Sequence, residues 1–263
     1  MDSNSFIAKV QINSFIKVLA MGITGVYLMQ YKKVLIKLSG EALYDKKNNS
    51  VFSNEILEFL ADEIKELSDM GLKIGLVFGG GNIFRGESGQ KLGIDRISGD
   101  HIGMLSTIIN SLMFKSLILK KGVSAELYTS LRIPAISSVN NLEEMNKKLE
   151  NNSVILFSGG TGKPFFTTDT AGSLFASAIK ADLLIKATKV NGIYDKDPVK
   201  NSDAKLYDKI TYDEAIEKNL KFMDISALSM CRDNKIKIVV CNLFEKNNLK
   251  KIVLGDKIGS LIY

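Results

Sequence analysis

The first strand of the expected fold is Val34-Leu-Ile-Lys-Leu38, and it runs directly into a Ser39-Gly40 turn. Residues 53–70 then carry apolar side chains at the spacing of an amphipathic helix with a serine N-cap, and Gly71 ends it. Lys73-Ile-Gly-Leu-Val-Phe78 is a second apolar strand. A strand, a helix and a strand in this order predict a βαβ unit, whose two strands lie parallel in one sheet.

The same alternation of strands and helices continues along the rest of the chain. Further strands are expected at residues 125–128, 154–157, 183–187, 237–241 and 260–263. Further helices are expected at residues 101–121, 142–150, 169–181, 211–219, 224–234 and 249–253. We therefore expect an α/β fold, a three-layer αβα sandwich around a mainly parallel sheet.

The composition is that of an ordinary globular protein, since 45% of the 263 residues are apolar and 24% are charged. These values exclude a collagen, a coiled coil or a disordered tail as a description of the whole chain. The net charge of +6 suits an anionic ligand without proving one. His101 is the only histidine, which excludes a histidine-rich metal site. We expect Cys231 and Cys241 to be free, buried thiols of a cytoplasmic protein.

Residues 1–28 do not share the pattern of the rest of the chain. The apolar run from Val18 to Met29 has about a dozen residues, fewer than the ~20 that a membrane helix needs. It is also a poor secretory signal, because the basic residues are spread out and no small-residue cleavage site follows. We expect translation to begin at Met29, with a genuine extension as the alternative, and residues 29–263 to form a single domain.

In a parallel sheet, ligands bind beyond the carboxyl ends of the strands, so the residues after each strand are informative. Lys37, Ser39 and Gly40 offer one positive charge and backbone N–H donors, although a surface lysine before a turn is the simpler interpretation. The spacing of a Walker A motif is absent. Gly79-Gly-Gly81 follows the second strand and allows a ligand to approach the backbone closely. Arg85 adds a planar cation that can grip phosphate oxygens.

The densest segment follows the fourth strand and reads Ser158-Gly-Gly-Thr-Gly-Lys-Pro-Phe-Phe-Thr-Thr-Asp-Thr170. Its glycines give access to the backbone, its threonines supply hydroxyl groups and its phenylalanines offer stacking faces, although the core is the commoner place for phenylalanine. Thr168 and Asp169 are expected to cap the next helix, whose N-terminus attracts anions. Taken alone, Asp169 is equally well explained as a plain N-cap.

Acidic side chains follow the fifth strand. Asp195 and Asp197 are either carboxylates suited to Mg²⁺ or simple loop acids, and Tyr194 can lie against a base. Asp224 is either an N-cap or a further acidic group near the phosphates. A Ser–His–Asp set could use only His101, and no G-x-S-x-G motif occurs. The strand ends thus offer Lys, Arg, glycine N–H groups and carboxylates, which is what phosphoryl transfer needs.

Several segments, in order along the chain, resemble the bacterial uridylate kinases, which have the amino acid kinase fold. They are Lys37-Leu-Ser-Gly-Glu-Ala-Leu43, Gly79-Gly-Gly-Asn-Ile-Phe-Arg-Gly86, Gly99-Asp-His-Ile-Gly-Met104, Gly160-Thr-Gly-Lys-Pro-Phe-Phe-Thr-Thr-Asp169, Ala187-Thr-Lys-Val-Asn-Gly192 and Met223-Asp224. The resemblance extends from Tyr31 to the end of the sequence. Within it, residues 164–169 and the Asp100 segment are specific to the branch that uses UMP.

This resemblance implies reversible, Mg²⁺-dependent transfer of the γ-phosphoryl group of ATP to UMP, giving UDP and ADP in pyrimidine nucleotide biosynthesis. It implies a UMP-binding lobe at about residues 29–168 and an ATP-binding lobe at about residues 169–263. The implied ATP-binding residues are Lys37, Leu38, Ser39, Gly40, Gly81, Arg85, Thr188, Tyr194 and Asp197. The implied UMP-binding residues are Gly80, Asp100, Thr161, Gly162, Lys163, Pro164, Phe165, Phe166, Thr167 and Thr168. The implied catalytic residues are Lys37, Arg85, Asp169 and Asp224, and no metal ligand is implied directly because Mg²⁺ arrives with ATP.

Two places depart from the family pattern. Lys163 stands where the family usually has Asn, and we expect its side chain to point to solvent. Family members that GTP activates have a glycine-rich stretch after the first turn, but residues 44–52 contain no glycine. We therefore expect a weak or absent response to GTP. The resemblance also implies a homohexamer, with no nucleic acid or membrane as partner.

Two other functions stay open from the sequence alone. A kinase of the same fold that acts on a carboxylate or carbamate would form an acyl phosphate, but it has no need for Arg85 with Asp100 or for the aromatic pair before Thr167. A non-catalytic nucleotide-binding regulator would keep the pocket without turnover, although Lys37 and Asp197 are intact. A nucleic-acid binder is disfavoured, because the chain lacks a basic surface pattern interleaved with aromatic residues.

Overall fold

The computed structural model describes residues 28–137, 141–151 and 153–263, so the expected N-terminal extension lies almost wholly outside the described residues. Within them, one sheet has the strand order β3-β4-β2-β1-β5-β9-β10-β8. Its strands are β1 (Lys33–Leu38), β2 (Lys73–Phe78), β3 (Ala125–Thr129), β4 (Val154–Ser158), β5 (Leu183–Thr188), β8 (Lys209–Ile210), β9 (Lys237–Asn242) and β10 (Ser260–Ile262). All neighbouring strands run parallel except β9 and β10, which confirms the expected mainly parallel sheet.

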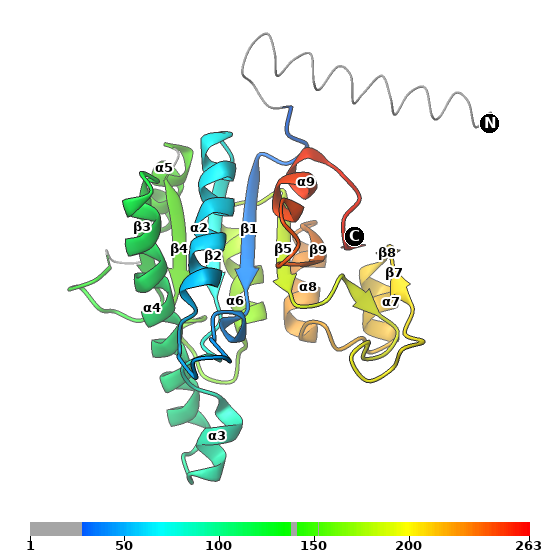
Figure 1. The fold of residues 1–263 in the computed structure, drawn as a ribbon, viewed down its shortest axis with the longest axis horizontal. Coiled ribbons are helices and arrows are strands. Elements are labelled where there is room, and N and C mark those ends of the chain that lie inside the picture. Colours follow the sequence, from blue (N-terminus) through cyan, green and yellow to red (C-terminus); the bar gives the residue numbers. More distant parts are fainter. Residues whose placement is uncertain (1–27, 138–140, 152) are drawn as a thin grey trace.

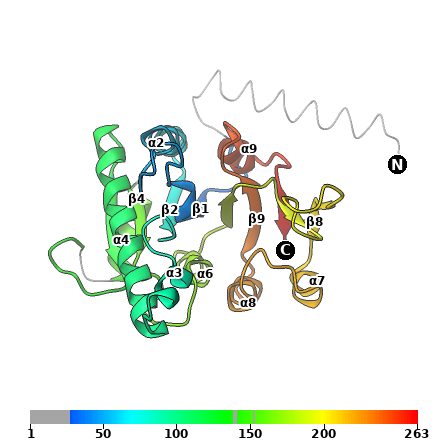
Figure 2. The ribbon, with the colours of Figure 1, turned by 60° about the horizontal axis from the view of Figure 1, so that its bottom comes forward.

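Helices cover both faces of this sheet and complete the three layers (Figures 1 and 2). One face packs against α2 (Asn54–Asp69), α4 (Arg96–Lys120) and α9 (Asn248–Leu254). The other packs against α5 (Leu142–Glu150), α6 (Thr168–Ala178), α7 (Tyr212–Glu217) and α8 (Ile225–Asp233). Along β1, Val34, Ile36 and Leu38 face the first layer and Leu35 faces the second, because successive side chains of a strand point to opposite faces.

The ends of the expected helices follow from their caps. The Ser53 hydroxyl accepts a hydrogen bond from the Ile56 N–H, so α2 begins where the sequence predicts. Helix α4 begins at Arg96, five residues before the expected start at His101, because the Asp95 carboxylate accepts from the Ser98 N–H and caps it there. The expected cap of α6 was also wrong, since the Thr167 hydroxyl, one residue earlier, accepts from the N–H of Asp169.

Several short elements were not expected from the sequence, and the two-residue strand β8 is one of them. A 3-10 turn, η1 (Gly40–Ala42), follows β1, and α3 (Gly86–Lys91) follows the glycine-rich turn after β2. The strands β6 (Ile193–Tyr194) and β7 (Leu206–Tyr207) form a small antiparallel pair beside the main sheet. The elements η1, α3 and β6 each come next in the chain after a central strand, so they begin near the edge where ligands bind in parallel sheets.

Among the described residues, α4 is the one helix whose length and composition would allow it to cross a membrane. Its inward side is buried in this protein, where Phe114 and Ile118 pack into the core beside α2. Helix α4 is therefore accounted for as a core helix.

Candidate active site

The turns after β1 and β2 touch each other at the carboxyl edge of the sheet. The Gly79 N–H donates to the carbonyl of Leu38 at 2.8 Å. A Cβ atom on Gly40 would lie 2.4 Å from the Gly79 carbonyl oxygen and 2.7 Å from the Gly81 nitrogen. No side chain fits in such a gap, so Gly40 is required for the close approach of the two turns. The sequence-predicted glycines are thereby brought together at one place.

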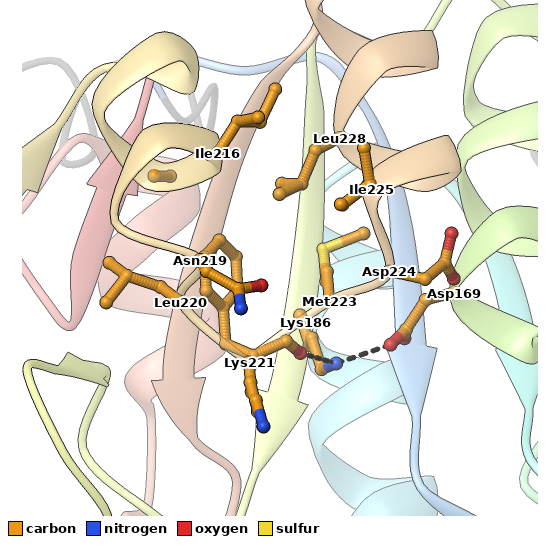
Figure 3. A pocket seen from close by; sticks show the side chains of 12 residues that line it. Asp169, Lys186, Ile216, Asn219, Leu220, Lys221, Met223, Asp224, Ile225 and Leu228 are labelled. Atoms are coloured by element: carbon orange, nitrogen blue, oxygen red, sulfur yellow. Dashed lines mark hydrogen bonds and ion pairs between the residues drawn. The ribbon is translucent and has the colours of Figure 1, made fainter.

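Lys37, Asp169 and Lys186 form a buried charge cluster next to these turns. The Lys37 Nζ lies 2.8 Å from Asp169 Oδ1, and the Lys186 Nζ lies 2.6 Å from Asp169 Oδ2. Lys37 and Lys186 are register neighbours on the parallel strands β1 and β5, so one carboxylate at the start of α6 reaches both ammonium groups. Lys186 also donates to the carbonyl of Phe222, as Figure 3 shows.

The charges of this cluster depend on one another. Burial alone would raise the pKa of the Asp169 carboxyl, but Lys37 and Lys186 outweigh it and hold that pKa below its usual range. Burial lowers the pKa of Lys186, and Asp169 opposes this effect. Asp169 therefore stays ionised, and it fixes the position of both ammonium groups. Two ammonium groups thus face the Asp169 carboxylate, and the Asp224 carboxylate also acts on Lys186.

Asp224 connects helices α6 and α8 at the side of this cluster. Its carboxylate accepts from the Ala227 N–H at 2.8 Å and so caps α8. It also accepts from the hydroxyl groups of Thr170, at 3.0 Å, and Thr167. Asp169, Lys186 and Asp224 line a common cavity of about 480 Å³ (Figure 3). Asp224 is thus the N-cap that the sequence offered as one alternative, and its place near the phosphates stays a prediction.

Asp100 and Phe165 meet at the other side of the glycine turns. The Asp100 carboxylate accepts from the Phe165 N–H at 2.6 Å and from the Arg96 Nε at 2.8 Å. The Arg96 guanidinium carbon lies 5.5 Å from the centre of the Phe165 ring, within the range of a cation–π contact. Phe165 is 64% exposed and Phe166 is also exposed, so neither belongs to the core. Exposed aromatic rings can stack on a ligand, and in this structure the Phe165 ring already contacts Arg96.

The segment after β4 turns sharply between these two regions. Gly159, Gly160 and Gly162 all have positive φ angles, of 78°, 57° and 76°. The Ser130 hydroxyl donates to the Gly160 carbonyl at 2.8 Å and holds this turn against the end of β3. Lys163 is exposed, as expected for a side chain that points to solvent.

Arg85 lies over the first glycine turn. Its Nε donates to the Gly81 carbonyl at 3.3 Å, and its Nη2 lies 3.3 Å from the Glu41 carboxylate. The guanidinium is more than half exposed, so it can exchange these contacts for phosphate oxygens. Arg85 is therefore a cation whose exposed end lies beside a set of backbone N–H groups.

Known proteins with this chemistry match the chain closely. Residues 32–242 match the amino acid kinase family. The uridylate kinases of Parabacteroides distasonis and Methylococcus capsulatus are 44% and 46% identical over 236 and 232 residues, covering 90% and 88% of this chain and 100% and 97% of those proteins. The chain belongs to the uridylate kinases of the amino acid kinase family.

Solved structures of uridylate kinases agree with this assignment. The structure of UMP kinase from Bacillus anthracis superposes with a TM-score of 0.85 at 38% identity, covering 88% of this chain and 96% of that one. UMP kinase from Ureaplasma parvum superposes with a TM-score of 0.83 at 30% identity, covering 89% and 99% of the two chains. The expected amino acid kinase fold is therefore confirmed.

Three further residues that the uridylate kinase resemblance implied for ATP lie at the end of β5 or after it: Thr188, Tyr194 and Asp197. Tyr194 and Asp197 line a second cavity, of about 550 Å³, which shares residues 219–222 with the first. The Asp197 carboxylate accepts from the Val199 N–H at 2.9 Å and shapes its own loop. The Thr188 hydroxyl donates to the Val190 carbonyl at 2.9 Å, so it stabilises the turn after β5.

Lys186 is the member of the site that sequence reasoning missed in this uridylate kinase. A usable signal was present, because Leu35-Ile-Lys37 and Leu184-Ile-Lys186 place a lysine at the same point of two apolar strands. A buried lysine requires a partner, and two such lysines on neighbouring strands share one. Among the described residues, no group of three or more His, Cys, Asp or Glu side chains could hold a metal ion.

Proposed function

We propose that this chain transfers the γ-phosphoryl group of ATP to UMP, giving UDP and ADP, as a UMP kinase of pyrimidine nucleotide biosynthesis. The observation that carries the proposal is the cluster of Lys37, Asp169 and Lys186 beside the touching glycine turns. Relatives that are 44% to 46% identical over nearly their whole length are uridylate kinases. An acyl-phosphate-forming kinase is not favoured by any observation on the site.

The donor nucleotide is assigned to the side of the charge cluster. ATP would extend from the cavity at Tyr194 and Asp197 to the N–H groups around Gly40 and Gly81. Lys37 and Arg85 would neutralise the phosphates, with Leu38, Ser39 and Thr188 shaping the backbone around them. This arrangement places the ATP lobe at about residues 169–263 together with the turn after β1.

The acceptor nucleotide is assigned to the opposite side. Gly80 and residues 161–168 would surround the UMP phosphate and uracil, with Phe165 and Phe166 as exposed stacking faces. Asp100 would accept hydrogen bonds from the ribose hydroxyls, for which it must give up part of its contact with Arg96 or Phe165. These residues lie in the proposed UMP lobe, at about residues 29–168.

Phosphoryl transfer then depends on position and charge. The Lys37 and Lys186 ammonium groups balance the charge that develops on the transferred group, and Asp169 holds both in place. The UMP phosphate is itself an anionic nucleophile, so the protein needs no general base. Mg²⁺ would neutralise phosphate charge when bound. The two lysines occupy the Asp169 carboxylate, so Mg²⁺ would be held chiefly by the ATP phosphates.

The test is a coupled assay of ADP release, in which UMP, CMP, glutamate and aspartate are offered as acceptors with ATP and Mg²⁺. UDP formed from UMP, with little or no turnover of the others, is the expected result. Turnover of glutamate or aspartate instead would support the acyl-phosphate alternative and refute the proposal. Omission of Mg²⁺ should abolish UDP formation.

The assembly and location of the protein belong to the same proposal. Leu105, Ile109 and Met113 follow one another at intervals of four residues on α4 and are exposed. Such an apolar stripe on a long helix fits a second copy of the same chain, and we propose that it contributes to a homohexamer. Cys231 and Cys241 are free and buried, which supports a cytoplasmic protein.

A further inference from the structure

The inward face of helix α4 contacts two glycine turns of the site, the turn after β2 and the turn after β4. A Cβ atom on Gly80 would lie 2.7 Å from Ser106 Cβ and 2.8 Å from the Gly103 carbonyl oxygen. A Cβ atom on Gly160 would lie 3.2 Å from Met104 Cγ. The turn after β2 and the turn after β4 therefore rest on the same short stretch of α4.

Asn110 fixes the first of these turns. This side chain is completely buried, and its Nδ2 donates to the Gly79 carbonyl at 2.7 Å. Its carboxamide also pairs reciprocally with that of Asn82, at 2.7 and 2.9 Å. Because a trans peptide points its C=O and N–H in opposite directions, the Gly79 carbonyl held toward α4 directs the Gly80 N–H away from α4. In the proposed function, a phosphate would lie on that side of the turn.

Thr107 fixes the second turn, one helical turn before Asn110. Its hydroxyl accepts from the Gly159 N–H at 2.8 Å and donates to the Met104 carbonyl at 2.7 Å. Thr107 is buried as well. One face of α4 thus holds a carbonyl of the first turn and an N–H of the second, through two neighbouring side chains.

We propose that Thr107 and Asn110 are positioning residues that set the spacing between the two glycine turns. This inference rests on the proposed function, in which the turn at Gly79 contacts both nucleotides and the turn at Gly159 holds the acceptor. Transfer in line requires the two phosphates to be aligned to within a fraction of an ångström. Two side chains from one rigid helix provide such alignment, although neither touches a nucleotide.

The chain offers a matched control on the same helix. Ser111 is also completely buried, but within the described residues its hydroxyl has no hydrogen-bond partner. Ser111→Ala therefore removes a buried polar atom from α4 without releasing either turn. Thr107→Val is nearly isosteric and removes the contact to Gly159, whereas Thr107→Ser retains a hydroxyl group.

Steady-state kinetics with UMP and ATP test the proposal. Thr107→Val and Asn110→Leu should each lower kcat about 10-fold or more, because each nucleotide still binds its own turn but the two are misaligned. KM for either nucleotide should change by less than about threefold. Thr107→Ser should recover most of kcat, and Ser111→Ala should match the wild type. The double variant of Thr107→Val and Asn110→Leu should be little slower than the slower single variant. Loss of either side-chain contact is already enough to let the distance between the two turns vary.

Amide hydrogen exchange of the nucleotide-free protein provides a readout that does not need activity. Exchange at residues 79–82 should accelerate in Asn110→Leu, and exchange at residues 159–162 should accelerate in Thr107→Val, with no change in Ser111→Ala. A wild-type enzyme that fails to phosphorylate UMP would refute the proposed function and leave this measurement intact. Unchanged exchange, unchanged kcat in Thr107→Val, or equal losses in Thr107→Val and Thr107→Ser would each overturn the inference.

Discussion

Lys37 and Lys186 show how a positive charge is kept inside an apolar strand. Each lies in a run of buried residues, where an unpaired ammonium group would cost several kcal/mol (on the order of a buried ion's effective desolvation). Asp169 offsets this cost for both at once, at 2.8 and 2.6 Å. The result is a pair of ammonium groups held in fixed positions by one carboxylate, with the Asp224 carboxylate beside them.

Replacing Lys37 separates its proposed role in turnover from a role in acceptor binding. Lys37→Ala should lower kcat by about 100-fold or more, because it removes a charge that stabilises the transferred phosphoryl group. UMP affinity, measured by calorimetry, should stay nearly unchanged. Lys65→Ala, on the exposed side of α2, is the matched control and should behave as wild type. A parallel loss of UMP affinity would show that Lys37 does not belong to the donor side.

Replacing Asp169 should lower the free energy of unfolding by an amount that depends on pH. Its folded-state pKa is held below the ordinary value of about 4, so its ion pairs stabilise the protein above that value and are lost as pH falls through the folded pKa. Asp169→Asn should therefore lower the free energy of unfolding by about 3 kcal/mol near pH 7, and the deficit should shrink below about pH 4. Urea unfolding between pH 3 and 7 measures this difference.

The exposed pair of Lys65 and Asp69 supplies the control for that experiment. Asp69→Asn makes the same chemical change at the surface, where solvent screens the charges, and should leave urea unfolding nearly unaltered. A deficit in Asp169→Asn that stays constant down to pH 3 would contradict the assignment of a lowered pKa.

At the scale of elements, the cap side chains explain which helix ends could be predicted from the sequence. Long apolar periods predicted the main strands and helices, and the caps Ser53 and Thr211 marked two helix starts. The early start of α4 depended on Asp95, which no apolar period marks. The two-residue strands β6 and β7 are too short to show a period, since they form only where the loop of residues 195–205 folds back on itself.

The segment after the first turn carries the prediction about regulation. Residues 44–52 form a closed turn, in which Asp45 and Ser50 exchange backbone hydrogen bonds and the Asp45 carboxylate accepts from the N–H groups of Lys47 and Asn48. Without glycine, this turn has fewer conformations available. GTP should therefore produce little or no increase in rate when ATP is subsaturating. A several-fold increase would contradict this prediction.

At the scale of the whole molecule, the sequence predicted the sandwich, and it predicted that residues at and just after the carboxyl ends of several strands gather at one edge of the sheet. It could not predict Lys186 from strand ends, since that residue lies inside β5. Nor could it show that one helix supports two turns separated by about eighty residues in sequence, which arises only from packing of α4 against β2 and β4. Such contacts depend on the tertiary fold and leave no local pattern.

The apolar stripe on α4 leads to a prediction about assembly. Ile109→Glu should reduce the proposed hexamer to smaller species, because it introduces a charge into a surface meant for a second copy. Sedimentation velocity measures the change, with Leu142→Glu, an exposed apolar position on α5, as control. A wild-type protein that sediments as a monomer would refute the proposed assembly.

Strand β10 has a consequence for how the enzyme matures during synthesis. It lies between β8 and β9 in the sheet, and its Ser260 hydroxyl accepts from the Ile193 N–H. The hairpin of β6 and β7, which borders the Tyr194 cavity, is therefore attached to the last strand in chain order. A ribosome releases segments in order, and residues 260–262 emerge after every other element of the sheet. A nascent chain can thus pair β1 with β2 early, whereas the hairpin of β6 and β7 gains its contact with Ser260 only after β10 has emerged.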